Sequence, residues 1–348
     1  MYSKLYRSIK IKTKAPQSPA ARGNECEFRS GNRRDSRQQS AVESTHTNAQ
    51  EQITGTFVSH ATIIAQEQMY NPRMQPFIFR LNSLALYLLG SLLLTACAVA
   101  TPPSACPDCQ VGSFITSPID GMQSMYVPAG TFTMGNESGN NDEKPVHEVY
   151  LDAFWIDQTE VTNAMYAQCV AATTCQPPAS AASYTHTPYY GNPEFDTYPV
   201  VYVNWSQAQA YCQWAGRRLP TEAEWEKAAR GTDGRTYPWG NVAAESKYLN
   251  FRGEFGDMSA VGSYPAGVSP YGALDMAGNV SEWVASLHQA YPYEAADGRE
   301  NMDTPNGRFV IRGGAWGDFD SYVYAAHRDW LNQTDTGYYL GFRCARSQ

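Results

Sequence analysis

The sequence predicts an α+β fold, in the form of a single irregular, loop-rich domain with little regular secondary structure. Of the 348 residues, 27 are Gly and 21 are Pro, 13% are aromatic and only 17% are charged. This composition suits a loop-rich globular fold better than a helical bundle. Helical spacing of apolar residues occurs mainly in the middle of the chain, and short apolar segments between Gly- and Asn-rich loops follow it. The chain shows no internal repeat and no heptad pattern.

The N-terminal part of the chain differs from the rest. Residues 1–73 are polar, mixed in charge and without apolar periodicity, which predicts disorder. Residues 74–97 then contain an apolar run from Ser83 to Ala96. This run is shorter than the ~20 residues that a membrane-spanning helix needs, but it has the length of a signal-peptide core. We therefore expect that Met74 is the true start and that residues 1–73 come from a wrongly assigned one.

The end of this segment, Leu94-Thr95-Ala96-Cys97, resembles a bacterial lipobox. In that motif the cysteine becomes the lipidated first residue of the mature protein, and small residues precede it where the apolar run stops. An ordinary signal peptide or a buried helix is the alternative. The motif predicts a lipid-anchored protein of the bacterial cell envelope, outside the cytoplasm, with residues 98–120 as a Pro- and Ser-bearing tether.

Charge and cysteine content narrow the partners and the compartment. A net charge of −8 and a pI near 5.3 argue against nucleic acid as the main partner. Export implies an oxidising compartment, so the cysteines of the mature chain are disulfide candidates. Cys106 and Cys109 have the spacing of a redox motif, but they lie in the tether without a βαβ pattern, which favours a local disulfide.

The predicted domain, residues 121–348, opens with short strands. Apolar residues alternate with small or polar ones over residues 125–134, around a Pro-Ala-Gly turn. Residues 146–151 lead to a further strand at 154–156. Thr162 has the side chain of an N-cap, and we expect a helix to follow it.

The central section predicts two short helices. Ser206 can cap the first, and Gly216 ends it as the residue after the C-cap. Thr221 and Glu224 form the capping box Thr-x-x-Glu of the second helix, which stops at Gly231. Beyond this point the sequence contains almost no helix signal.

Several long motifs occur in a fixed order: YVPAGTFTMG, VNWSQAQAYCQWAGRRLPTEAEWEKAARG, YPWGN, YGALDMAGNVSEW, RGGAW and GFRCAR. Together they resemble the formylglycine-generating enzyme domain, also called the sulfatase-modifying factor domain, over residues 122–346. The resemblance implies a single irregular α+β domain related to the C-type lectin fold. It also implies a chemistry, because members that make formylglycine oxidise a cysteine of a client sulfatase with O₂ and a copper ion held by two thiolates.

The two thiolates of the family lie between the RGG and GFRC motifs, with four residues between them. Soft thiolate ligands select Cu(I), so this chemistry needs both. Residues 313–343 contain no cysteine, and Val323 and Arg328 fall roughly where the thiolates would be. A lone His327 does not replace the pair. The sequence therefore does not support copper binding or an enzyme, although the family would suggest one.

The resemblance implies calcium instead. Hard oxygen ligands, supplied by amide, carboxylate and main-chain carbonyl groups, are those that Ca²⁺ prefers. Two sets of residues match calcium sites of the family: Asn279, Val280 (by its carbonyl oxygen) and Glu282, and less completely Asn250, Phe251 (by its carbonyl oxygen) and Asp257. The alternative for the first set is a turn in which the side chains bond only the backbone.

The resemblance also implies a disulfide between Cys212 and Cys344. Cys169 and Cys175 are close in sequence and are expected to pair with each other. Free buried thiols, the alternative for both pairs, are less common outside the cytoplasm.

Residues 315–339 combine aromatic and charged side chains in a composition that suits recognition. We interpret this stretch as a binding surface for a protein, peptide or glycan ligand at the cell envelope. The alternative is that about half of its aromatic residues fill the core, as large aromatics often do. The expected contact residues are Trp316, Phe319, Tyr322, Tyr324, His327, Arg328, Trp330 and Tyr338.

Three functions remain open at this point. The first is a lipid-anchored, calcium-stabilised, non-catalytic binding module. The second is a formylglycine-generating or other oxidising enzyme, against which the missing thiolates count. The third is a diversified lectin-like ligand-binding protein, since the same fold carries variable C-terminal segments in some bacteria.

Overall fold

The computed structural model describes residue 106, residues 108–304 and residues 306–348. The expectations for residues 1–73, for the signal segment with Cys97 and for most of the tether concern residues outside those described. Within the described part of the chain, no helix is both long enough and apolar enough to cross a bilayer.

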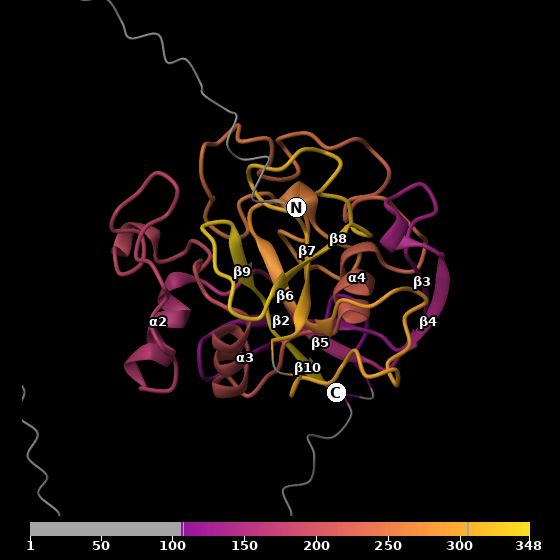
Figure 1. Ribbon diagram of the computed structural model, residues 1–348, viewed down its shortest axis with the longest axis horizontal. Coiled ribbons are helices and arrows are strands. Elements are labelled where there is room, and N and C mark those ends of the chain that lie inside the picture. The colour runs from indigo at the N-terminus through magenta and orange to yellow at the C-terminus, as the bar shows by residue number, and fades with distance from the viewer. Residues whose placement is uncertain (1–105, 107, 305) are drawn as a thin grey trace, which may run out of the picture. The chain divides into compact units, whose positions relative to one another are not determined.

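Three small sheets form the framework of the domain (Figure 1). The first has the strand order β1-β2-β5-β10 and is antiparallel throughout, and the second is the β3-β4 hairpin. The third has the order β8-β7-β6-β9, with β6 and β9 parallel. The strands are β1 (Phe114–Thr116), β2 (Gln123–Val127), β3 (Gly130–Met134), β4 (His147–Leu151), β5 (Phe154–Asp157), β6 (Ser281–Leu287), β7 (Arg308–Arg312), β8 (Arg328–Asn332), β9 (Leu340–Phe342) and β10 (Ala345–Ser347).

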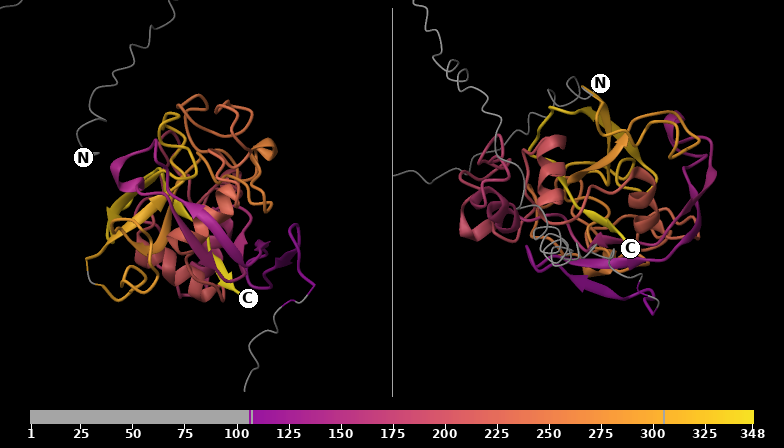
Figure 2. Two further views of the ribbon diagram at one scale, coloured as in Figure 1. Left: turned by 90° about the vertical axis from the view of Figure 1, so that its right-hand side faces the viewer. Right: turned by 90° about the horizontal axis from the view of Figure 1, so that it is seen from below.

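Short helices pack around these sheets. Helices α3 and α4 both contact β6 and lie on either side of it in Figure 1, and the view from below in Figure 2 shows strands of the third sheet between helices. Long loops connect these elements, which confirms the predicted loop-rich α+β class. The helices are α2 (Asn163–Ala171), α3 (Trp205–Trp214) and α4 (Glu222–Arg230), and the 3₁₀ turns are η2 (Asn141–Glu143), η3 (Pro193–Phe195) and η4 (Pro265–Gly267).

Local capping signals predicted most helix ends correctly. The Thr221 hydroxyl accepts a hydrogen bond from the Glu224 amide, and the Glu224 carboxylate accepts one from the Thr221 amide. Gly231 follows α4 in a left-handed conformation, with φ of 71°, which a glycine adopts without strain. Thr162 caps α2 as expected.

The predicted N-cap of α3 is wrong by two residues. Asn204 caps this helix, and Gln207 completes a capping box by bonding back to the Asn204 amide. Ser206 lies inside the first turn instead. The amide pair competes successfully because each side chain satisfies a backbone amide that the helix start would otherwise leave unpaired. Gly216 lies just beyond the end of α3, as predicted.

Helix α4 is unusual because every one of its nine residues is buried, the charged ones included. Buried charges must be paired to be tolerated. Glu226 pairs with Arg230 of the same helix and with Arg312 of β7, and Glu222 also pairs with Arg312. Helix α4 is thus fixed to the third sheet by ion pairs as well as by apolar contacts.

The structure confirms both predicted disulfides. Cys212–Cys344 joins α3 to the segment before β10, with Cα atoms 5.6 Å apart and a sequence separation of 132. Closing so long a loop stabilises the fold by ~4–5 kcal/mol in the chain-entropy model. Cys169–Cys175 closes a short loop after α2, and the local Cys106–Cys109 disulfide is also formed.

Candidate functional site

Val323 and Arg328 are the residues that the sequence predicts to lie roughly where copper-binding members of the resembled family carry thiolates. Val323 is completely buried in a small apolar cluster with Leu249, Phe251 and other side chains. Arg328 begins β8, and its guanidinium holds both carboxylate oxygens of Glu222, at 2.7 and 2.8 Å. Neither side chain is a soft ligand, and neither is free to move into an open site.

Arg328 is part of a buried charge network, and its interpretation as a surface contact is wrong. Its remaining guanidinium nitrogen donates to the main-chain oxygens of Asp142 and Gln289. Burial favours a raised pKa for Glu222, but the guanidinium groups of Arg312 and Arg328 outweigh burial and hold that pKa below its usual value. The network therefore keeps a charged carboxylate inside the domain.

His327 is also buried, with 6% of its surface exposed, and faces η2. Its Nδ1 lies 3.5 Å from a carboxylate oxygen of Glu143, which is fully buried. The Tyr324 hydroxyl donates to the same oxygen at 2.5 Å. Together with the Arg328 bond to Asp142, these contacts fasten the η2 loop onto the segment that leads into β8. The side chains of His327 and Tyr324 thus make their main contacts inside the domain and do not form an exposed surface.

An exposed group of rings does exist beside this segment. Tyr184, Trp316 and Tyr338 lie with ring centroids 5.1 to 6.1 Å apart, and we name this group the aromatic ledge. Tyr184 is 60% exposed, whereas Trp316 is only 7% exposed and forms the base. Trp316 Nε1 is buried and has no hydrogen-bond partner. Sequence reasoning missed Tyr184 because it lies far from residues 315–339 in the chain.

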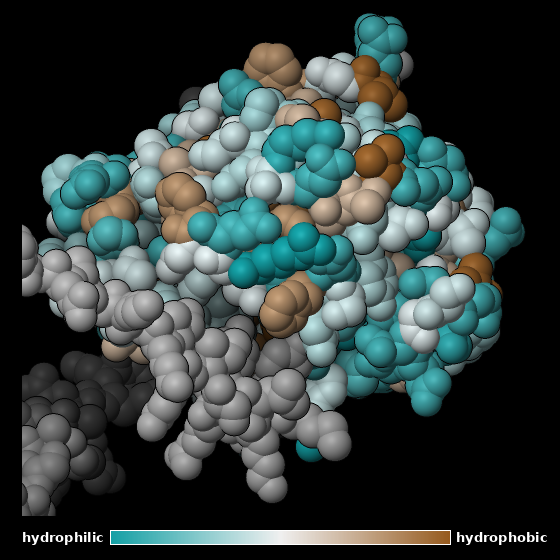
Figure 3. Space-filling model, turned by 90° about the horizontal axis from the view of Figure 1, so that it is seen from above, coloured by the Kyte–Doolittle hydropathy of each residue, from teal (hydrophilic) through white to brown (hydrophobic). Residues whose placement is uncertain are grey.

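The other predicted contact residues divide between surface and interior. Phe319 is 59% exposed, and Tyr322, Tyr324, Trp330 and Tyr338 are half-buried. Trp330 lies under the guanidinium of Arg308, 4.2 Å from the ring centroid. The space-filling view in Figure 3 shows hydrophobic side chains scattered among hydrophilic ones over one face of the domain. Recognition on such a face would rest on individual aromatic residues.

The first predicted set of calcium ligands is engaged in protein contacts. Both oxygens of Glu282 accept hydrogen bonds from Arg343 at 2.7 Å, and one also accepts from the Trp225 indole. The side-chain oxygen of Asn279 accepts from the amide and hydroxyl of Ser259, and Val280 is fully buried. These two side chains do not leave oxygens pointing at a shared position.

A second pair of carboxylates, missed at the sequence level, lies next to this set. One carboxylate oxygen of Glu160 accepts a hydrogen bond from the side-chain nitrogen of Asn279, and its other oxygen is buried without a partner. Burial and the charge of Asp275 raise the pKa of Glu160 well above its usual value. Burial likewise raises the pKa of Asp275. Asp275 and Asn279 also have φ values of 57° and 58°, strained for residues other than glycine and frequent at binding sites.

These carboxyl groups outnumber the cations beside them, and burial raises the pKa values of Glu160 and Asp275, which favours their protonated forms. Glu160, Asp275 and Glu282 together face a single buried cation, Arg343. Across the described residues, no three His, Cys, Asp or Glu side chains are placed together as metal ligands. A cation held here would therefore need amide and main-chain oxygens in addition to the carboxylates, which is the ligand mixture that Ca²⁺ accepts.

The second predicted set contains a buried polar atom without a partner. The side-chain oxygen of Asn250 accepts no hydrogen bond, while its nitrogen donates to the Asp257 carbonyl. The Asp257 carboxylate accepts from the Ser183 hydroxyl and from the amide and hydroxyl of Thr185. An orphaned amide oxygen of this kind costs stability unless a cation or water meets it.

The sequence of this chain is similar to those of several known proteins. Residues 113–348 match the family model described as the sulfatase-modifying factor enzyme 1-like domain. The chain is 33% identical over 247 residues to the serine/threonine-protein kinase pkn1 of Chlamydia caviae, covering 64% of this chain and 38% of that protein. It is 34% identical over 277 residues to the inactive C-alpha-formylglycine-generating enzyme 2 of Bos taurus, covering 64% of this chain and 87% of that protein. It thus spans well under half of the chlamydial kinase and most of the bovine protein.

Solved structures give the same picture of the fold. PvdO from Pseudomonas aeruginosa aligns with a TM-score of 0.55 and 26% identity, covering 69% of this chain and all of that one (100%). Treponema denticola variable protein 1 aligns with a TM-score of 0.54 and 22% identity, covering 68% and 99%. At that identity the second likeness concerns the fold alone.

Proposed function

The chain belongs to the sulfatase-modifying factor family, and from that premise we propose that it is a non-catalytic, calcium-stabilised binding module of the bacterial cell envelope. One observation carries the proposal. Both thiolate positions hold side chains built into the core, Val323 in an apolar cluster and Arg328 in an ion pair. Copper chemistry of the family's type requires two thiolates that bind Cu(I), and this segment supplies none.

The proposed ligand is a protein, peptide or glycan, and the aromatic ledge is the proposed contact. Rings that expose a flat face can stack on sugar rings or on aromatic side chains at low conformational cost. Immobilised protein should retain a component of an envelope extract, and Tyr184→Ala should reduce that retention. Tyr150→Ala removes a similarly exposed ring on β4 (64% exposed) and should leave retention unchanged.

The catalytic part of the proposal has a direct assay. We expect that the purified protein, supplied with copper and O₂, does not convert the cysteine of a Cys-x-Pro-x-Arg peptide to formylglycine. The mass of the peptide and aldehyde capture report the conversion, and a formylglycine-forming family member serves as positive control. Turnover above a copper-only blank would contradict the proposal. It would favour the second candidate function, formylglycine generation. The 31% identity to the formylglycine-generating enzyme of Bos taurus supports that alternative.

The proposed calcium has fitting ligands in both predicted regions. Near Asn279, the buried carboxyls of Glu160 and Asp275 share one cation, Arg343, with Glu282. In the other region, the orphaned oxygen of Asn250 offers a ligand beside Asp257. Bound calcium would supply positive charge that stabilises these buried oxygens, and it would not take part in a reaction. If the fold depends on calcium, removing it with a chelator should lower the stability of the domain.

The proposed location rests on the lipobox. We expect that mass spectrometry of the membrane fraction finds a mature N-terminus at a diacylated Cys97. Cys97→Ser should release the protein from the membrane fraction, because the lipid would be its only strong attachment. Recovery of cellular peptides from residues 1–73 would contradict the assignment of Met74 as the start.

A further inference from the structure

One face of the first sheet lies outside the apolar core clusters, although its side chains Tyr126 and Trp155 are buried. Neighbouring residues across an antiparallel sheet point to the same side, and residues alternate along each strand. Tyr126, Trp155 and Arg346 are direct neighbours across β2, β5 and β10, so they share one face. Met125 and Ile156 point the other way, into an apolar core cluster. The face that carries Trp155 is therefore the outer one.

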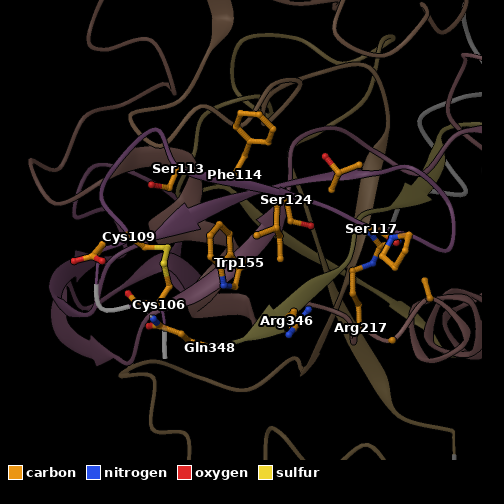
Figure 4. A pocket seen from close by; sticks show the side chains of 16 residues that line it. Cys106, Cys109, Ser113, Phe114, Ser117, Ser124, Trp155, Arg217, Arg346 and Gln348 are labelled. Carbon is orange, nitrogen blue, oxygen red and sulfur yellow. Dashed lines mark hydrogen bonds between the residues drawn. A yellow bond between two sulfur atoms is a disulfide. The ribbon is translucent and has the colours of Figure 1, made fainter. Parts of the chain in front are cut away.

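A pocket of about 500 Å³ lies on this outer face. Figure 4 shows Trp155 in the middle, the Cys106–Cys109 disulfide on one side and Arg217 with Ser117 on the other. Its volume is in the range of small-molecule sites, ~300–1,000 Å³. None of the residues at the thiolate positions, in the aromatic ledge or in the two calcium sets lines it. It is therefore separate from the features on which the proposed function rests.

Two arginines line the pocket and can only donate hydrogen bonds, whereas its Ser, Thr and Gln side chains can donate or accept. The side chain of Arg346 has no hydrogen bond or ion pair within the described residues. Arg217 is 8% exposed, and its outer nitrogens pair with Asp120 and Asp157. Its Nε, however, is buried and has no partner. A guanidinium donates hydrogen bonds and accepts none, so both groups call for an acceptor.

The apolar part of the pocket is aromatic. Trp155 is 5% exposed and packs on its sheet neighbour Tyr126, with ring centroids 5.2 Å apart. The remaining charged lining residue is Asp108, an exposed side chain next to Cys109 on the rim. A ligand with a flat apolar body could therefore lie against Trp155 and present its acidic group to the arginines.

We propose that this pocket binds a small organic anion, such as a carboxylate, that carries a flat apolar body. The paired outer nitrogens of Arg217 leave Arg346 as the main cationic contact, because its guanidinium is free for a bidentate bond to a carboxylate. The indole of Trp155 provides the stacking surface. The site is a second binding function, independent of the aromatic ledge and of calcium.

Binding of 2-naphthoate to the full chain with oxidised disulfides tests the proposal, with neutral 2-naphthamide as matched probe. Isothermal titration calorimetry should show submillimolar affinity for the acid and much weaker binding of the amide. Arg346→Gln should weaken naphthoate binding at least ~10-fold, since a charge-assisted bond is lost. Lys247→Gln removes an exposed charge elsewhere and should change nothing.

A second variant blocks the space without removing charge. Ile115 pairs with Ser124 across β1 and β2, faces the pocket and is half-buried, so Ile115→Trp should fill the pocket and abolish binding. Melting curves of each variant establish that it is folded. Equal affinity for acid and amide, unchanged binding by Arg346→Gln, or no binding at several millimolar would each overturn the proposal.

Discussion

Replacing Arg328 with alanine is expected to lower the free energy of unfolding by ~3 kcal/mol, the low end for a broken buried ion pair, because Glu222 loses one of its two cationic partners and keeps Arg312. Both oxygens of Glu222 are held by Arg328 in a fully buried setting. The main-chain oxygens of Asp142 and Gln289 would lose their donor as well. Urea denaturation followed by fluorescence measures the change.

The chain offers a matched control for this prediction. Arg252 also forms a bidentate ion pair. Its guanidinium nitrogens lie 2.6 and 2.7 Å from the carboxylate oxygens of Asp320, but both side chains are 41% exposed. Exposed pairs contribute ~0–1 kcal/mol, so Arg252→Ala should change stability little. Arg328→Lys keeps the positive charge but cannot form the bidentate pair with Glu222. Its loss of stability should therefore fall between those of Arg328→Ala and Arg252→Ala. Similar losses for Arg328→Ala and Arg252→Ala would show that burial of the pair has no energetic weight.

The same pair bears on catalysis in this family. Restoring both thiolates would need Val323→Cys and Arg328→Cys. The first change exchanges one small buried side chain for another of similar size. The second removes the partner of Glu222 and carries the full cost predicted above. Cysteines at these two predicted positions would therefore leave Glu222 with Arg312 as its remaining ion-pair partner among the described residues.

Local signals in the sequence predicted most helix ends and the two short-range disulfides, the family resemblance implied the Cys212–Cys344 disulfide, and non-local contacts account for what was missed. The Thr221–Glu224 capping box spans one turn, so its meaning is visible in the sequence alone. Asn204 displaced Ser206 as the cap of α3 because two adjacent candidates differ only in which side chain finds a partner. Such choices depend on a few hydrogen bonds and are poorly determined by residue type.

Burial of charged residues could not be foreseen from their own neighbourhood. Arg328 looked like a surface residue beside His327 and Asp329, yet its partner Glu222 lies 106 positions earlier. The alternative that some aromatic residues fill the interior holds for Trp316, whose ring is nearly covered. The sequence alone predicts no role for Glu160. Its role beside Asp275 depends on the fold bringing two distant loops together.

Calcium removal is expected to lower the free energy of unfolding by ~2.7 kcal/mol when the starting calcium is 100 times its Kd. For a domain of this size that corresponds to a fall in Tm of ~5–10 °C. Glu160 and Asp275 supply the reason, because above their raised pKa values the two buried carboxylates repel each other unless calcium lies between them. Thermal melting with calcium and with chelator measures the gap.

The difference in stability between calcium-bound and calcium-free protein should also depend on pH. The raised pKa values of Glu160 and Asp275 determine the direction of this dependence. In calcium-free protein the folded state holds protons on Glu160 and Asp275 that the unfolded chain loses near pH ~4. The folded state then binds more protons, so its stability falls as pH rises from that point to the raised folded pKa values. Calcium displaces these protons and binds better at high pH. The calcium gap should therefore be small in mild acid and full above the window.

Single substitutions distinguish the carboxyl pair from other buried acids. Glu160→Gln should remove most of the calcium gap while leaving the chelated protein as stable as before, or more so, because it relieves the repulsion. Glu300→Gln is the matched control, since burial raises the pKa of Glu300 as well, but its contacts are Ser286 and Tyr293. A gap that survives Glu160→Gln and disappears in Asn250→Leu would assign calcium to the second set. Superimposable curves with calcium and with chelator would contradict a calcium site altogether, and the buried charge of Glu160 would then have to be neutralised by a proton.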